Sequence, residues 1–124
     1  MGHLSPPDGE SGILFQMCGI TYPSRNYIIN RPVSTVSCLE TVRSGRGTVI
    51  LDGHEYRLSA GDTYLLPEGH SHRYFSDRTD PWEKVWVNFS GVFSRSLLHL
   101  WGLETACVFR GLDLSPLLLQ LQPC

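Results

Sequence analysis

The sequence predicts an all-β fold, a small barrel or sandwich of short antiparallel strands, with an α-helix appended near the C-terminal end. Two observations predict this class. Between residues 45 and 75, short apolar stretches alternate with turn residues at close, regular intervals, which is typical of such folds. From residue 93 onward, the apolar residues recur at helical spacing. At 124 residues, the chain is long enough for one domain with a single core.

The segment 45–74 contains the clearest strands and turns. Thr48–Leu51 is β-branched and apolar, which suits a strand, and Asp52-Gly53 favours the type I′ turn between antiparallel strands. A second turn is expected at 60–62. Pro67 cannot donate to a strand ladder and therefore ends a strand. The strands predicted in this segment are 48–51, 55–58, 63–66 and a strand that starts at 70 and reaches 75.

The remaining segments are expected to complete a barrel over residues 13–110. Residues 1–12 are rich in Gly, Pro and Ser, so we expect a flexible arm there. Cys38 and Glu40 lie on one face of the strand expected at 35–43, and neither face is clearly apolar, so which face points inward stays open. The further strands expected are 13–20, 27–29, 35–43, 82–89 and 106–109.

The strand at 82–89 has two different faces. By period-two alternation, one face carries Val85, Val87 and Phe89 and suits packing against a helix. The other face carries Trp86 and Lys84, aromatic and polar groups that form an unusual lining for a plain core. Sugars bind by stacking on an aromatic ring while fixed polar groups contact their hydroxyls. This face therefore predicts either a sugar-type pocket or a core with aromatic residues, two alternatives that alternation alone does not separate.

Two helices are expected after this strand. The first is predicted at about 93–102, with Gly102 as its C-terminal stop. Ser115 is predicted as the N-cap of a second helix, with Pro116 at its first position. The segment 111–124 would then hold the start of a leucine-rich helix that the chain truncates.

Composition excludes several functional classes. The net charge of −2 and the absence of a basic run predict that this chain alone does not bind DNA specifically. No apolar run reaches membrane-spanning length, and no signal peptide is apparent. The four cysteines are widely spaced, so we expect reduced thiols and a cytoplasmic protein.

No catalytic constellation is apparent, and we expect no catalytic residue, no cofactor and no bound metal. No Gly-x-Ser-x-Gly sequence and no glycine-rich phosphate loop before a helix occur. His70-x-His72 resembles a pair of metal ligands, but His70 is expected in a turn. Two ligands do not hold a transition metal tightly.

The motif Gly61-Asp62, Leu66-Pro67, Gly69 and His72 resembles the second conserved motif of the cupin superfamily. The segment 82–91, together with Arg31-Pro32, is similar to the effector-binding domain of AraC-type transcription regulators. The resemblance implies a cupin-like double-stranded β-helix, or jelly-roll barrel. In metal cupins of this kind, Glu40 would align with a metal-ligating glutamate, but the preceding histidine pair is missing.

The resemblance implies a bacterial effector-sensing and dimerisation domain whose helix-turn-helix DNA-binding half is absent from this chain. Full-length protein would be a homodimer that contacts DNA only through that half. The implied effector is a sugar, a sugar acid or a similar small molecule, because Arg31 and Lys84 would place two cations in one cavity. A small metal-dependent cupin enzyme, of the sugar isomerase or dioxygenase type, and a stand-alone cupin without ligand are the alternatives. The ligand-binding residues implied are Thr21, Arg31, His72, Tyr74, Lys84 and Trp86.

Overall fold

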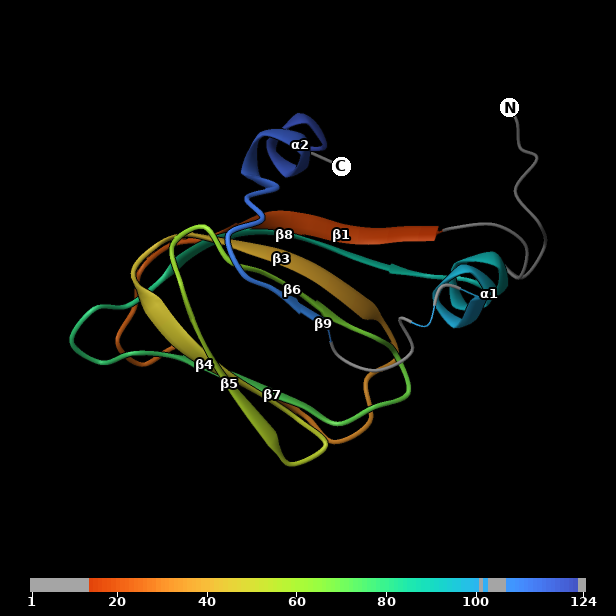
Figure 1. Cartoon of the computed structure of the whole chain (residues 1–124), viewed down its shortest axis with the longest axis horizontal. Coiled ribbons are helices and arrows are strands. Elements are labelled where there is room, and N and C mark those ends of the chain that lie inside the picture. The colour runs from red at the N-terminus through yellow and green to blue at the C-terminus, as the bar shows by residue number, and fades with distance from the viewer. Residues whose placement is uncertain (1–13, 101, 103–106, 123–124) are drawn as a thin grey trace.

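Two antiparallel sheets face one another in the structure, a computed structural model that describes residues 14–100, 102 and 107–122 (Figure 1). One sheet has the strand order β1-β8-β3-β6-β9, and the other has the order β2-β7-β4-β5. The predicted all-β class is confirmed. The strands are β1 (Leu14–Thr21), β2 (Ile28–Arg31), β3 (Ser37–Ser44), β4 (Arg46–Leu51), β5 (His54–Ser59), β6 (Thr63–Leu66), β7 (His72–Ser76), β8 (Glu83–Ser90) and β9 (Cys107–Phe109), and the helices are α1 (Val92–Leu100) and α2 (Ser115–Gln120).

The turns follow the local chemistry of the sequence. Asp52 and Gly53 both have positive φ, 48° and 87°, as a type I′ turn requires, and β4 pairs with β5 on either side of them. Asp62 serves the next turn, where its carboxylate accepts the backbone N–H of Ser59 at 3.0 Å and that of Gly111 at 3.0 Å. One side chain therefore ties the turn before β6 to the segment after β9.

The inward face of β3 is the one that carries Cys38 and Val42, which are fully buried in the main core between the sheets. Leu39 points to the opposite side and joins a second cluster. The question that alternation left open is thereby answered. The main core also contains Trp82 and Tyr64, so it combines aromatic with aliphatic side chains.

Helix α2 covers the outer face of the five-stranded sheet (Figure 1). Leu118 is 1% exposed and packs with Val85 and Val87 of β8, as the aliphatic face of that strand predicts. The expected N-cap is wrong, because Leu114 occupies the cap position and Ser115 is the first helical residue. The Asp113 carboxylate instead accepts the Ser115 backbone N–H at 2.8 Å.

Three further expectations concern the N-terminal arm, the cysteines and membrane-spanning segments. The flexible arm predicted at 1–12 lies outside the described residues. Cys38 is a free, buried thiol, but Cys18 is disulfide-bonded, which corrects the expectation of reduced thiols at that position. Within the described residues, neither helix has the length and apolar character needed to cross a bilayer.

Candidate functional site

A buried ion pair lies in the space between the two sheets. Glu40 of β3 and Lys84 of β8 are 2% and 0% exposed, and Lys84 Nζ lies 2.6 Å from Glu40 Oε1. Lys84 Nζ also donates to Tyr64 Oη at 2.7 Å, and Tyr64 Oη donates to the same carboxylate oxygen at 2.6 Å. The three polar atoms form a closed triangle, so the buried charges are paired and hydrogen-bonded as burial requires.

Four aromatic rings surround the ammonium group of Lys84. Their centroids lie 4.2 Å (Trp82), 4.4 Å (Tyr74), 5.0 Å (Tyr27) and 5.4 Å (Tyr64) from Nζ. All four distances are within the range of a cation–π interaction. We call this set, with Glu40, the lysine cage.

Burial and charge act in opposite directions on Lys84. Burial lowers the pKa of Lys84, whereas the carboxylate of Glu40 raises it. Burial, followed by the charge of Glu40, raises the pKa of Tyr64 well above its usual value, so the phenol keeps the proton that it donates. The lysine cage is therefore a filled, internally neutralised part of the core.

Trp86 lies on the same inward face of β8, one step further along the strand. Its Nε1–H donates to Thr21 Oγ1 at 3.0 Å. Gly19 of β1 lies against the indole, and a Cβ atom at this position would come within 2.9 Å of the ring. Because Trp86 and Thr21 are both half-buried, this part of the interior has access to solvent.

Arg31 of β2 reaches across to the opposite sheet, where its Nη1 donates to Cys38 Sγ at 3.1 Å. Burial raises the pKa of the Cys38 thiol to about 12, so the acceptor is a neutral sulfur and a weak one. Cys38 pairs with Asn88 across β3 and β8, next to the pair of Glu40 and Trp86 along the same inward face. Asn88 Oδ1 is buried without a hydrogen-bond partner among the described residues. We call Thr21, Arg31 and Trp86, which are all half-buried, the rim.

His72 of β7 is fully buried. Its Nε2 lies 2.7 Å from the carbonyl oxygen of Pro67, and since a carbonyl only accepts, Nε2 carries the proton. Nδ1 is then an acceptor, and it has no hydrogen-bond partner in the part of the chain that the structure describes. Burial lowers the pKa of His72, which favours the neutral ring.

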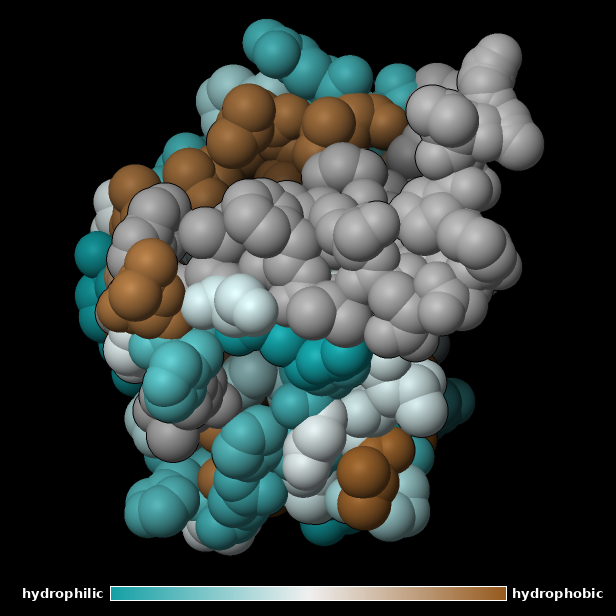
Figure 2. Space-filling view, turned by 90° about the vertical axis from the view of Figure 1, so that its right-hand side faces the viewer, coloured by the Kyte–Doolittle hydropathy of each residue, from teal (hydrophilic) through white to brown (hydrophobic). Residues whose placement is uncertain are grey.

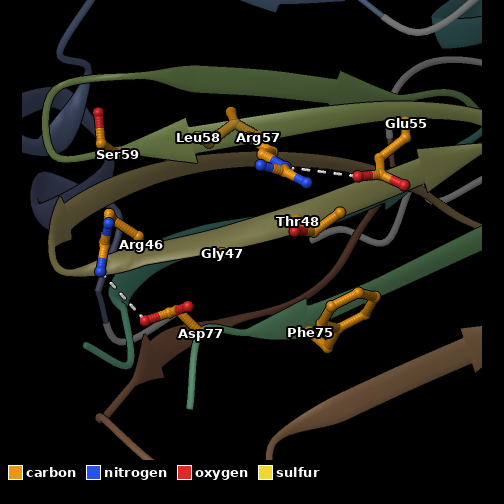
Figure 3. Close-up of a pocket in the computed structure, with 9 residues that line it drawn as sticks. All are labelled: Arg46, Gly47, Thr48, Glu55, Arg57, Leu58, Ser59, Phe75 and Asp77. Atoms are coloured by element: carbon orange, nitrogen blue, oxygen red, sulfur yellow. Dashed lines mark hydrogen bonds and ion pairs between the residues drawn. The ribbon is translucent and has the colours of Figure 1, made fainter. Parts of the chain in front are cut away.

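The six residues implied as ligand-binding thus separate into two groups. Thr21, Arg31 and Trp86 are half-buried at the rim, whereas the other three are fully or almost fully buried: His72, Tyr74 and Lys84. Glu40, rather than a ligand, supplies the counter-charge of Lys84, and this corrects the expectation of two uncompensated cations in one cavity. A hollow of about 620 Å³ lies instead on the outer face of the four-stranded sheet, beside Arg46, Arg57 and Phe75 (Figure 3).

Sequence reasoning missed the cage residues Tyr27 and Tyr64 and the role of Glu40. The sequence did contain one indication of this role, because Glu40 is a charged residue on the same face of β3 as Cys38 and Val42. Its carboxylate is engaged by Lys84 and Tyr64 rather than held open for a metal. Across the described ranges, no group of three or more His, Cys, Asp or Glu side chains is placed to hold a metal ion.

Comparison with known proteins places these residues in a family context. The family model of the AraC-like ligand binding domain matches residues 37–123. The lactose operon transcription activator of Staphylococcus xylosus is 36% identical over 74 residues, which are 60% of this chain and 26% of that protein. The raffinose operon transcriptional regulatory protein RafR of Pediococcus pentosaceus is 30% identical over 103 residues, or 82% of this chain and 37% of that protein. The chain spans well under half the length of these two relatives.

Two solved structures share the fold at low sequence identity. YhaK from Escherichia coli superposes with a TM-score of 0.55 and 16% identity, over 73% of this chain and 42% of that one. ToxT from Vibrio cholerae superposes with a TM-score of 0.50 and 11% identity, over 88% of this chain and 44% of that one.

Proposed function

The chain belongs to the AraC-like ligand binding domain family, and from this premise we propose that it is the effector-binding part of a sugar-responsive transcription regulator. The two relatives above are named for the lactose and raffinose operons. The helix-turn-helix half that would contact DNA is not part of the sequence printed here. The protein would act by binding a ligand and not by catalysis.

The observation that carries the proposal is the rim. It presents the half-buried indole of Trp86, fixed by its hydrogen bond to Thr21, and the guanidinium of Arg31, whose described partner is a thiol. An aromatic face with fixed polar groups beside it is the usual chemistry of a sugar site. Arg31 offers five N–H donors in a rigid fork that suits neighbouring hydroxyls. The unpartnered Asn88 Oδ1 adds an acceptor on the same inward face.

The internal pairing of Lys84 with Glu40 leaves one cation, rather than two, for a ligand to contact. Because Glu40 neutralises Lys84, Arg31 is left as the cation of the site, and the hydroxyl oxygens of a sugar would accept hydrogen bonds from its N–H donors. Lactose and raffinose, the sugars in the relatives' names, are neutral. We therefore propose a neutral di- or trisaccharide that binds at the rim above the filled lysine cage.

Self-association through α2 is the second part of the proposal. Leu117 and Leu121 of this segment are 54% and 37% exposed, although Leu118 between them is buried against β8. Figure 2 shows a hydrophobic surface near the top of the molecule, at the height that α2 occupies in Figure 1. An exposed apolar helix face of this kind is typical of an interface. A shift in how two chains present their DNA-binding halves would require the sugar to bind the two arrangements differently.

The test is a binding titration of the 124-residue chain with lactose, raffinose and glucuronate, followed by thermal unfolding. A neutral sugar at one hundred times its dissociation constant should raise the free energy of unfolding by about 2.7 kcal/mol. Trp86→Ala should weaken binding at least about fivefold, because a central aromatic contact is worth more than about 1 kcal/mol. Phe75→Ala is the matched control, since this aromatic residue lies on the outer face of the other sheet (Figure 3).

Two results would contradict the proposal. One is sugar binding that Trp86→Ala leaves unchanged, which would place the ligand elsewhere. The other is one stoichiometric Fe, Mn or Zn ion per chain whose removal abolishes a turnover of sugar, which would favour the metal-dependent enzyme.

A further inference from the structure

A second hollow, of about 260 Å³, lies where β2 and β7 meet the loops before and after them. Three arginines line it: Arg25 from the turn before β2, Arg73 from β7, and Arg78 from the loop after β7. All three are exposed. Arg73 alternates with the inward-facing Tyr74 along β7, so its side chain lies on the outer face of the sheet, and Tyr27 is the one residue of the lysine cage that also lines this hollow.

Strand pairing brings the three arginines to one place. Ile28 pairs with Phe75, and just beyond this pair the Ser76 N–H donates to the Tyr27 carbonyl at 3.2 Å. The turn that carries Arg25 precedes this end of β2, and the loop that carries Arg78 follows this end of β7, so both residues line the same hollow. The arginines are therefore neighbours because of the sheet and not because of their spacing in the sequence.

Local contacts restrict the side chain of Arg73 and the loop backbone that carries Arg78. The guanidinium of Arg73 lies 5.6 Å from the centroid of the Phe75 ring, within cation–π distance. The loop that carries Arg78 is closed by Asp77, whose Oδ2 accepts Thr79 N–H at 3.2 Å and Asp80 N–H at 2.9 Å. The hollow thus has a pre-formed wall on one side.

The positive charge in the hollow is not neutralised within the described part of the chain. No carboxylate there lies within 4.0 Å of the guanidinium nitrogens of Arg25, Arg73 or Arg78. The nearby acids Asp77 and Asp80 pair instead with Arg46, at 3.3 Å and 3.4 Å. Figure 3 shows Arg46 joined to Asp77 and, further along the same face, Arg57 joined to Glu55. Arg46 and Arg57, on the same sheet but outside the hollow, are thus paired with carboxylates, whereas the three arginines that line it have no such partner among the described residues.

A buried polar group also lines the hollow. Ser76 is 4% exposed, and its hydroxyl has no hydrogen-bond partner among the described residues. A buried hydroxyl without a partner is uncommon in proteins. Along β7, however, Ser76 shares the inward face with Tyr74, so the amide of Asn26 is the neutral polar group that accompanies the three guanidiniums.

We infer that this hollow binds a phosphate group, either free phosphate or the phosphate of a small monoester. Three arginines that line one hollow would match the several oxygens and the double negative charge of this group, with charge-assisted and partly bidentate hydrogen bonds. A hollow of 260 Å³ accommodates phosphate with a short carbon chain. The site is separate from the sugar site proposed at the rim and stands without it.

The inference is tested by calorimetric titration of the 124-residue chain at constant ionic strength with inorganic phosphate, glycerol 3-phosphate and acetate. We expect saturable binding of one phosphate group per chain and much weaker binding of acetate. Arg73→Gln and Arg78→Gln should each weaken phosphate binding about tenfold, because each removes one charge-assisted contact. Arg57→Gln is the matched control, because it removes the same charge from the same sheet face outside the hollow and should leave the affinity unchanged.

The two phosphate ligands distinguish the sources. Tighter binding of glycerol 3-phosphate identifies a small phosphate monoester, and tighter binding of inorganic phosphate identifies the free ion. The inference is overturned if neither ligand saturates, or if Arg73→Gln and Arg78→Gln bind phosphate like the unchanged chain. It is also overturned if duplex DNA binds to the hollow in a manner that these variants weaken while phosphate does not compete.

Discussion

Replacement of Lys84 by methionine removes the ammonium from the lysine cage while nearly conserving volume. Little cavity cost is expected, so the change in stability measures the lost electrostatic contacts. The substitution deletes the 2.6 Å contact with Glu40 and leaves that carboxylate buried with Tyr64 as its hydrogen-bond partner. Removing one partner of a buried ion pair costs about 3–5 kcal/mol, and the loss of cation–π contacts adds to this.

The assay is urea unfolding at pH 7, followed by circular dichroism, for Lys84→Met, Glu40→Gln and the double variant. Each single variant should lose about 3–5 kcal/mol, which is a large part of the stability of a domain this size. The double variant should recover at least about 2 kcal/mol of the summed losses, because it leaves no charge unpaired in the core. Additive losses, or a Lys84→Met variant within about 1 kcal/mol of the unchanged chain, would refute the ion pair as described.

Three further predictions concern the core and the surface. Burial lowers the pKa of His72 in the folded chain below its usual value of 6.5. The stability that the neutral ring contributes is therefore complete above pH 6.5 and is lost as the pH falls through the folded pKa. His72→Gln should flatten this pH dependence in unfolding measured from pH 7 to 5. Gly47→Ala should lower the free energy of unfolding by about 1–3 kcal/mol in the same urea assay, because the added Cβ atom would lie too close to the Trp82 ring. An unchanged unfolding midpoint would contradict this packing. Leu117→Glu should shift a self-associating chain toward monomer in sedimentation velocity without changing its unfolding midpoint; an unaltered profile would argue against α2 as the interface.

Local sequence signals predicted the strands and turns well, because each depends on residues close together in the chain. Asp52-Gly53 specifies its own turn, and the alternation along β8 separates Val85 and Val87 from Lys84 and Trp86. The second helix begins at Ser115, one residue earlier than predicted. The Asp113 carboxylate accepts the Ser115 N–H and thereby takes over the role of the cap.

The lysine cage was not predictable in the same way, because it depends on contacts between distant residues. Lys84 and Glu40 are separated by 44 positions, and alternation gives the face of each strand but not the register between strands. Without that register, Lys84 is a cation without a counter-charge and indicates an acidic ligand. With it, the charge of Lys84 is neutralised internally by Glu40, and Lys84 no longer indicates an acidic ligand.

Two indole N–H groups distinguish the rim from the lysine cage and provide the most direct test of a sugar site at the rim. Trp86 Nε1–H bonds Thr21 in the half-buried rim, whereas Trp82 is fully buried against Lys84. Proton–nitrogen NMR spectra, assigned with Trp86→Phe and Trp82→Phe variants, would follow both signals during titration with lactose and raffinose. The predicted result is a saturable shift of the Trp86 signal with little movement of the Trp82 signal. A saturable shift of Trp82 alone, or no shift of Trp86 with either sugar, would contradict a sugar site at the rim.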